Sequence, residues 1–461
     1  MRFVNKSPLI LAPGQTRPLV FQIRVDNMNA TGPIPAIPVT LRYRVKSPDL
    51  PVHELVFTLK LERRSMHEPH RVTHFNPGGI VSYAMLRPPS PNATCVTNGN
   101  SSAPVLLQFH GAGVEADNGI VAHSLDPLPD LCAWVLYPTG VTPWSSDDWH
   151  NWGFADVEAA VASIPAWIES TGWQGIGVDT EKWLISGHSN GGQGTWYALT
   201  HRPDKVFAAA PVSGYLSIHS YVPYQFWRSM DPRKRAIIEA SANSYRHELL
   251  ASNAKGIPVF QQHGSLDDNV PTYHSRLMSQ LLSETGWPSE YSELPGKGHW
   301  FETVMTTEGL QNFYTEQLKS PKSPSINLTD FELVVANPGD MGSKAGVTVL
   351  YLEDPGQLGK LRASADRTKA DWKFQTGNIL AFQLEGRGMS VKTVKIDEQH
   401  LVLDDSALTD TQQTLHFFKT SDNDWILKVS TVSAVSSTAR TCWLASCSGS
   451  LLPSSLLVGS C

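Results

Sequence analysis

The sequence predicts an α/β fold, in which a mostly parallel sheet with flanking helices lies between two regions rich in β-strand. Short apolar runs alternate with segments of helical periodicity between residues 73 and 322. This alternation is typical of parallel strands joined by helical crossovers. On both sides of that part, apolar and polar residues alternate one by one, which is the period of a half-buried strand.

Residues 1–72 are expected to form a small β-rich module. The segments 21–25, 39–45 and 54–61 alternate between apolar and polar residues, and the stretches between them contain proline and glycine. Because such stretches favour turns, the pattern indicates short strands in a sandwich-like arrangement.

Residues 73–322 are expected to hold the parallel sheet. Short apolar runs predict its strands at 105–109, 133–138, 183–186, 207–212 and 258–263. Apolar residues recur at helical spacing in 156–168 and 273–282, and the segment 190–199 can also be helical. Strands and helices therefore follow one another along the chain, as a parallel sheet requires.

The last part of the chain divides into two regions. Residues 319–324 have the composition of a linker, and residues 323–428 return to a β pattern, for example at 331–335 and 347–352. Residues 429–461 hold ten serines, three of the five cysteines and one charged side chain, Arg440. A segment of that composition buries little apolar surface, so we expect disorder or an aberrant end to the gene model, and a cleaved lipid-anchor signal is a third alternative.

The composition argues against several classes of function. The formal net charge is −6 and the pI is about 6.2, whereas a chain that binds nucleic acid usually carries a basic patch. No run of 18 or more uncharged apolar residues occurs, so we expect no membrane-spanning helix. We also expect no cofactor and no metal, because the sequence has no glycine-rich phosphate loop, zinc-type cysteine spacing or dinucleotide fingerprint.

The strongest motif is Gly-His-Ser-Asn-Gly-Gly at residues 187–192, which has the form G-x-S-x-G. It follows the predicted strand 183–186 and precedes the predicted helix 190–199. Gly187 and Gly191 remove side chains that would clash in so tight a turn. The hydroxyl of Ser189 is then presented above the sheet at a helix N-terminus. The motif therefore predicts a nucleophilic serine.

A serine hydroxyl needs a base and an orienting carboxylate, and in folds with this turn they follow in the order acid, then histidine. The loop after strand 258–263 carries Asp267 and Asp268. We favour Asp267, from its spacing to the His-Gly pair before it and the Val-Pro pair after it. His299 lies in a glycine-flanked loop after residues 290–294. The predicted triad is Ser189, Asp267 and His299.

Acyl transfer also needs backbone N–H groups that point at the developing oxyanion. One donor should be the N–H of Asn190, directly after the nucleophile. The other should come from the loop after strand 105–109, and Ala112 and Gly113 are both candidates because their small side chains admit a carbonyl oxygen. His110 and His188 are expected to have structural roles.

Four segments together, at 110–113, 187–192, 263–271 and 298–299, resemble the catalytic domain of the prolyl oligopeptidase family (peptidase family S9), within the α/β-hydrolases. The resemblance covers about 250 residues. It implies that Ser189 is the nucleophile, that His299 is the general base and acid, and that Asp267 orients His299. The family places a β-propeller before the catalytic domain. In that family the propeller restricts the substrates to short peptides. The 72 residues available here cannot form a propeller, so this restriction is either missing or provided by the flanking β regions.

The stretch from residue 137 to residue 153 also resembles secreted carboxylesterases that act on aryl or polymer esters. Its tryptophans, Trp144, Trp149 and Trp152, are candidates for an aromatic acyl pocket, and a core or lid position is the alternative. Three functions follow from the sequence. The first is a serine peptidase of the prolyl oligopeptidase type, the second is a carboxylesterase, and the third is a binding protein that keeps the fold without catalysis. The substrate is expected to be a peptide or another small molecule.

The sequence leaves the compartment open: no signal peptide is visible, and a secretory origin is a hypothesis. Five Asn-x-Ser/Thr sequons occur, at Asn5, Asn29, Asn92, Asn100 and Asn327. Cys95 and Cys132 flank the first strand of the expected parallel sheet, and the sequence leaves open whether they pair or remain buried thiols.

Overall fold

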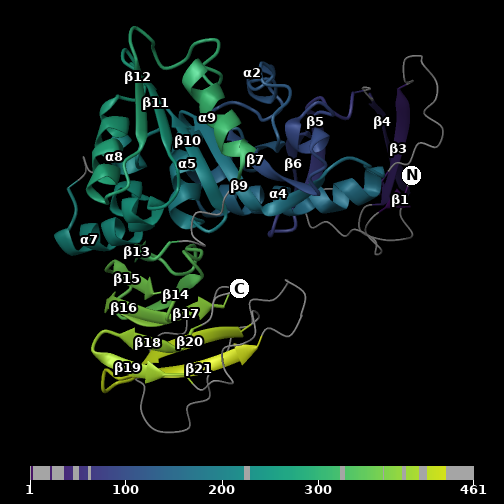
Figure 1. Ribbon diagram of the computed structural model, residues 1–461. Coiled ribbons are helices and arrows are strands. Elements are labelled where there is room, and N and C mark those ends of the chain that lie inside the picture. The colour runs from purple at the N-terminus through teal and green to yellow at the C-terminus, as the bar shows by residue number, and fades with distance from the viewer. Residues whose placement is uncertain are drawn as a thin grey trace.

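The computed structural model describes residues 2–3, 21–22, 36–44, 51–60, 64–222, 229–321, 328–366, 368–386, 391–403 and 413–431. Its main unit is an eight-stranded sheet with helices packed against it, and a smaller all-β unit follows (Figure 1). In order across the sheet, the strands are β12 (Glu290–Leu294), β11 (Phe260–Gly264), β10 (Val206–Val212), β9 (Gly177–His188), β7 (Ser102–Phe109), β8 (Trp134–Pro138), β6 (Val81–Arg87) and β5 (His70–Phe75).

The expected mostly parallel sheet is confirmed. The strands from β7 to β12 pair in parallel, whereas β5 and β6 pair antiparallel at one edge. Every residue of β10 is buried, as expected for a central strand that is covered on both faces. The packed helices are α4 (Asn151–Thr171), α5 (Asn190–His201), α8 (Tyr273–Glu284) and α9 (Glu308–Lys319).

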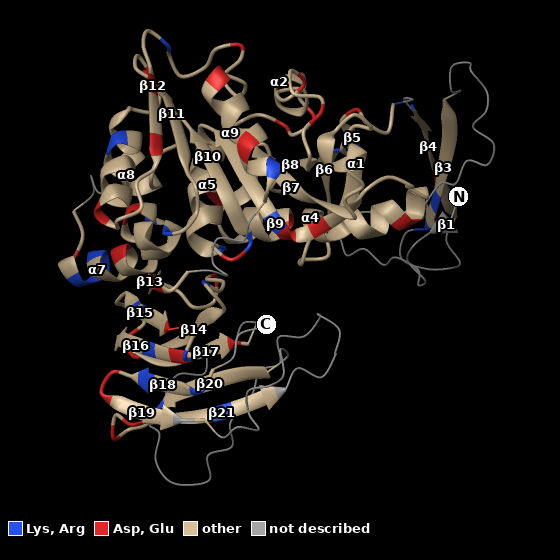
Figure 2. Cartoon of the chain, in the orientation of Figure 1, with Lys and Arg blue, Asp and Glu red and all other residues tan. Residues whose placement is uncertain are grey.

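Shorter helices lie in the connections. They are α1 (Thr94–Thr97), α2 (Gly119–Ala122), α3 (Ser145–Asp148), α6 (Ile218–Tyr221), α7 (Pro232–Ser241) and three 3₁₀ turns, η2 (Asn243–Tyr245), η3 (His247–Leu249) and η4 (Ala251–Ala254). No described helix is long and apolar enough to cross a membrane. Positions of Lys and Arg and positions of Asp and Glu are interspersed along the elements of both units (Figure 2).

Residues 328–431 form two packed sheets. One contains β13 (Asp330–Val335), β15 (Gly359–Asp366), β16 (Asp371–Gly377), β18 (Thr393–Ile396) and β19 (Gln399–Val402). The other contains β14 (Val347–Leu352), β17 (Ile379–Glu385), β20 (Gln413–Lys419) and β21 (Trp425–Thr431). Along β15, buried and exposed residues alternate one by one, and the rings of Phe374, Phe382 and Phe417 pack together between the sheets. The β-rich C-terminal region expected from the sequence is confirmed.

The N-terminal residues that the structure describes form two antiparallel pairs. β1 (Arg2–Phe3) pairs with β2 (Phe21–Gln22), and β3 (Ile37–Arg44) pairs with β4 (Val52–Leu59). Of the strand expected at 21–25, only residues 21 and 22 are described. β5 begins at His70 and belongs to the main sheet, so the boundary expected after residue 72 falls inside this strand. Residues 322–327 and 432–461 lie outside the described residues.

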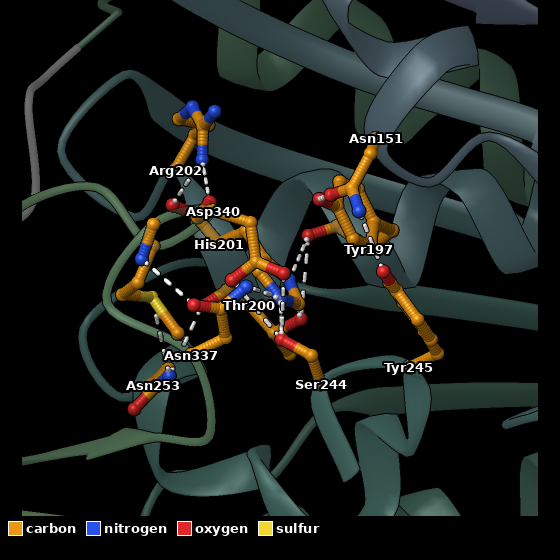
Figure 3. A network of polar contacts seen from close by, with 12 residues as sticks. Asn151, Tyr197, Thr200, His201, Arg202, Ser244, Tyr245, Asn253, Asn337 and Asp340 are labelled. Carbon is orange, nitrogen blue, oxygen red and sulfur yellow. Dashed lines mark hydrogen bonds and ion pairs between the residues drawn. The ribbon is translucent and has the colours of Figure 1, made fainter. Parts of the chain in front are cut away.

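The C-terminal unit is attached at the far end of helix α5. That helix starts next to Ser189 and runs for 12 residues, about 18 Å, to His201. There Asp340, from the loop between β13 and β14, accepts hydrogen bonds from Ser244 Oγ at 3.0 and 2.9 Å, and its backbone carbonyl accepts one from Arg202 (Figure 3). The contact therefore lies opposite the end of the helix that carries the serine.

Two buried side chains strengthen this attachment. The Lys344 ammonium donates to the carbonyls of Asn253 at 2.6 Å and Lys255 at 2.9 Å, and burial lowers the pKa of Lys344 to about 7. The amide of Asn253 donates to the Val334 carbonyl at 2.9 Å and accepts from the Val334 N–H at 2.8 Å, as a neighbouring strand would. These buried polar side chains have hydrogen-bond partners in the other unit, so the contact between the two units is a packed one.

Candidate active site

The serine of the G-x-S-x-G motif lies in a strained turn between β9 and α5. Ser189 has φ 61° and ψ −120°, a conformation that costs an ordinary residue about 1–3 kcal/mol. A Cβ atom on Gly187 would lie 2.4 Å from the carbonyl oxygen of Gly191, and one on Gly191 would lie 2.3 Å from that of Phe109. Both positions therefore exclude any side chain, which is the reason for the glycines in the motif.

The three residues of the predicted triad lie together. His299 Nε2 is 2.9 Å from Ser189 Oγ, and His299 Nδ1 is 2.8 Å from Asp267 Oδ2. Because a carboxylate can only accept, Nδ1 carries the proton and donates it to Asp267, which leaves Nε2 as the acceptor for the Ser189 hydroxyl. The ring is thus held in the tautomer that a general base requires.

Asp267 is held as an anion. Burial alone would raise its pKa, but hydrogen bonds from His263 and His299 outweigh this effect and hold the pKa well below the usual range. The N–H groups of Asn269 and Val270 also donate to Oδ1, at 3.0 and 2.8 Å. The Asp267 side chain is fully buried in this setting, whereas Asp268 is exposed to solvent.

Two further histidines support the three residues. His263 Nε2 lies 3.2 Å from Asp267 Oδ2 and 2.8 Å from the Val270 carbonyl, so this nitrogen is a donor. His188 Nε2 donates to the backbone carbonyl of His299 at 2.6 Å, and burial lowers the pKa of His188 to about 4. His188 is therefore neutral at physiological pH and fixes the loop that carries His299.

The structure separates the two candidates for the second oxyanion donor. Gly113, at φ 77°, donates its N–H to the Pro143 carbonyl at 2.8 Å. The Gly113 N–H is therefore already engaged. We correct the prediction that Gly113 is a candidate for the second oxyanion donor, and Ala112 remains the candidate. In the part of the chain that the structure describes, no acceptor takes the N–H of Ala112 or of Asn190. Both residues line the pocket next to Ser189.

The pocket at Ser189 has a volume of about 810 Å³ and a largely apolar lining. Its aromatic wall includes Trp144, Tyr215, Tyr221, Tyr245 and Trp300. Among the described lining residues, the carboxylates of Asp147 and Asp148 are the only Asp, Glu, Lys or Arg side chains. None of the lining residues belongs to the described part of residues 328–431 or to the described residues before Gln108, so the described residues of the flanking β regions contribute no wall to this site.

The three tryptophans expected near the pocket have different positions. Trp144 lines the pocket and is 65% exposed. Trp149 is fully buried beneath the site, with its ring stacked on Phe109 at a centroid distance of 4.8 Å. Trp152 is 58% exposed near Gly78 and is not among the lining residues that the structure describes. The structure thus brings only Trp144 to the pocket.

The structure adds a cluster that the sequence did not reveal, formed by Ser145, Asp148 and Tyr215 around the side chain of Asn190. Asp148 belongs to the stretch that resembles the carboxylesterases, but its direction depends on an uncommon backbone conformation, φ 69°. Periodicity and motif spacing carry no signal for such a conformation.

The described residues also include two of the five cysteines and side chains of the kinds that ligate a metal. In that part of the chain, no group of three or more histidine, cysteine, aspartate or glutamate side chains is placed to hold a metal ion. Cys95 and Cys132 are both buried as free thiols, and Cys132 Sγ accepts the N–H of Cys95 at 2.8 Å.

Comparison with known proteins supports the expected resemblance. Residues 141–320 match the prolyl oligopeptidase family. A protein of Arthroderma benhamiae described as an uncharacterized secreted protein is 44% identical over 329 residues, which are 71% of this chain. The chain covers only 35% of the length of that relative.

Solved structures to which the chain is similar include peptidases and a protein named Est1E. A puromycin-hydrolyzing peptidase of Mycobacterium tuberculosis is 20% identical, with 59% of this chain and 45% of that chain covered and a TM-score of 0.42. An acylaminoacyl peptidase of Pyrococcus horikoshii is 15% identical, with 59% and 46% covered and a TM-score of 0.43. Est1E of Butyrivibrio proteoclasticus is 17% identical, with 54% and 99% covered and a TM-score of 0.38.

Proposed function

We propose, from the match of residues 141–320 to the prolyl oligopeptidase family and from the geometry at Ser189, that the chain is a serine hydrolase that cleaves acyl bonds. The activity proposed first is that of a serine peptidase of the prolyl oligopeptidase type. The observation that carries the proposal is that His299 contacts Ser189 Oγ through one ring nitrogen and Asp267 through the other.

In this proposal His299 Nε2 removes the Ser189 proton while Oγ attacks the carbonyl carbon of the substrate. The N–H groups of Asn190 and Ala112 donate to the oxygen that becomes negative, and the Asp267 carboxylate stabilises the imidazolium. His299 then protonates the leaving amine or alcohol, and an acyl ester remains on Ser189. A water molecule deprotonated by His299 attacks this ester, and the proton returns to Ser189 as the acid leaves.

An esterase is the second candidate, and the pocket lining favours it. Trp144, Tyr215 and Tyr221 offer aromatic surface close to the serine, which suits an aromatic acyl group or alcohol. Because the acyl-enzyme chemistry is common to both activities, the fold alone does not distinguish them.

A substrate panel tests the proposal. The wild-type chain and the Ser189→Ala variant are assayed with proline-containing peptide anilides and with p-nitrophenyl esters of aliphatic and aromatic acids. Hydrolysis of the anilides at a kcat/KM above that of the esters supports the peptidase, and the reverse order supports the esterase. If the wild type hydrolyses none of these substrates faster than Ser189→Ala, the proposal fails and the third candidate, a binding protein with a hydrolase fold, is favoured.

We also propose a secretory origin. The relative from Arthroderma benhamiae is described as secreted, and of the five sequons Asn92 and Asn100 are exposed in the structure. Asn5, Asn29 and Asn327 lie outside the described residues. We expect the natural protein to migrate faster on a gel after treatment with a glycosidase specific for N-linked glycans. An unshifted band would show that neither exposed sequon carries a glycan.

A further inference from the structure

The side chain of Asn190, the first residue of α5, is held by three other side chains. Ser145 Oγ donates to Asn190 Oδ1 at 2.8 Å. The Asn190 amide donates to Tyr215 Oη at 2.9 Å and also to the carboxylate of Asp148. We call Ser145, Asp148 and Tyr215 the Asn190 clamp.

Most hydrogen bonds of the clamp lie among its own residues and Asn190, and Ser145 Oγ also lies 2.6 Å from the Trp144 carbonyl oxygen. Asn190 Nδ2 has two protons, and it donates one to Asp148 Oδ1 and the other to Tyr215 Oη. The Tyr215 hydroxyl proton is donated in turn to Asp148 Oδ1. Asp148 Oδ1 thus accepts from both Asn190 and Tyr215 and links these two side chains.

Local strain accompanies the clamp. Between residues 141 and 149 five residues other than glycine have positive φ, namely Val141, Ser145, Ser146, Asp148 and Trp149. Such conformations cost about 1–3 kcal/mol each; they persist only where the surrounding structure holds them, and they cluster at active sites. The segment supplies two of the three clamp residues, so its strained backbone brings Ser145 and Asp148 to Asn190.

The clamp contacts a residue whose backbone is placed to act on the reaction. The Asn190 N–H lies at the first position of α5, where no intrahelical acceptor is available, and it follows Ser189 directly. An oxyanion donor contributes only if it points at the developing charge before the reaction begins. A side chain fixed at three points restricts how the peptide of Asn190 can rotate.

We propose that Asp148 is a positioning residue for the oxyanion hole, which acts by holding the Asn190 side chain and thereby aiming the Asn190 N–H. This inference rests on the proposed serine hydrolase function. Asp148 does not touch the reacting atoms in this account, so its replacement affects the transition state more than the binding of substrate.

Kinetics of four variants test the proposal. Asp148→Ala removes the acceptor, and we expect kcat to fall by about tenfold, a fraction of the 10²–10³ that is typical of a lost oxyanion donor, with KM changed by less than about threefold. Asp148→Asn keeps a carbonyl oxygen at the same place and should retain kcat within about threefold. Tyr215→Phe should lower kcat in the same direction as Asp148→Ala. The exposed Asp422→Ala is the matched control and should match the wild type.

Two further measurements distinguish positioning from a general structural role. Phenylboronic acid forms a tetrahedral adduct with a catalytic serine, so its inhibition constant should rise by the factor by which kcat/KM falls in Asp148→Ala. Asn190→Ala keeps the backbone N–H but removes the clamped side chain. The double variant Asn190→Ala/Asp148→Ala should therefore be no slower than Asn190→Ala alone.

Three results would overturn the inference. They are a wild-type kcat in Asp148→Ala, a raised KM with unchanged kcat, and additive effects in the double variant. If Asp148→Ala does not fold, the same cycle with Tyr215→Phe and Asn190→Ala decides. Failure of the proposed function is recognised separately, because Ser189→Ala would then be as active as the wild type.

Discussion

Replacing Asp148 by Asn should make the folded protein more stable at pH 8. Burial raises the pKa of Asp148 to about 6 from an ordinary value of 3.8. The folded state therefore binds this proton more tightly than the unfolded state does, and ionisation of Asp148 disfavours folding. At about 1.36 kcal/mol per pKa unit, this raised pKa sets an upper limit of about 3 kcal/mol for the gain.

The pH dependence has a definite sign. The destabilisation is fully present above pH 6 and is lost as the pH falls through 6 toward 3.8. The advantage of Asp148→Asn should therefore shrink to about 0.5 kcal/mol at pH 4. Urea unfolding of wild type and variant at pH 8 and pH 4 measures this difference, and the exposed Asp422→Asn should show none at either pH. An equal advantage of Asp148→Asn at both pH values would show that Asp148 carries no buried charge.

The remaining predictions concern the triad acid, the attachment of the C-terminal unit and the end of the chain. Asp267→Asn should lower kcat by about 10⁴-fold, because the amide cannot hold the imidazole of His299 in its working tautomer. The exposed Asp268→Asn should lower kcat only a few-fold, and a reversed ranking in side-by-side assays would move the acid to Asp268. Asn253→Ala leaves three buried backbone groups unpaired and should cost about 3 kcal/mol or more in urea unfolding. The exposed Asn98→Ala should cost less than about 0.5 kcal/mol, and equal losses in both variants would refute this role of Asn253. Removal of residues 432–461 should leave kcat/KM unchanged, since β21 ends at Thr431, and lost activity would give that segment a structural role.

Local patterns were sufficient to predict the main sheet and the turn that carries Ser189. The G-x-S-x-G turn could be recognised because nearby backbone atoms leave no room for a side chain at Gly187 and Gly191, so the sequence must have glycine there. Asp267 and His299 could be expected near the serine because loops after parallel strands meet at the same edge of a sheet. The structure places both of them within hydrogen-bond distance of their expected partners.

Features that depend on long-range contacts could not be predicted. Whether Ala112 or Gly113 has an available N–H depends on the Pro143 carbonyl, which lies about 30 positions further along the chain. The burial of Trp149 and the direction of Asp148 both follow from positive φ angles, for which the sequence offers no glycine. The attachment of the C-terminal unit likewise rests on single polar side chains such as Lys344, whose partners are backbone carbonyls about 90 residues earlier.

The most direct test of the central claim is covalent labelling of the serine. The wild-type chain is incubated with a fluorophosphonate, and the adduct is located by mass spectrometry of tryptic peptides. We expect a single adduct on Ser189, which is absent in Ser189→Ala and forms much more slowly in His299→Ala, because the hydroxyl is then without its base. An adduct on another serine, or unchanged labelling of Ser189→Ala, would contradict the assignment of Ser189 as the nucleophile.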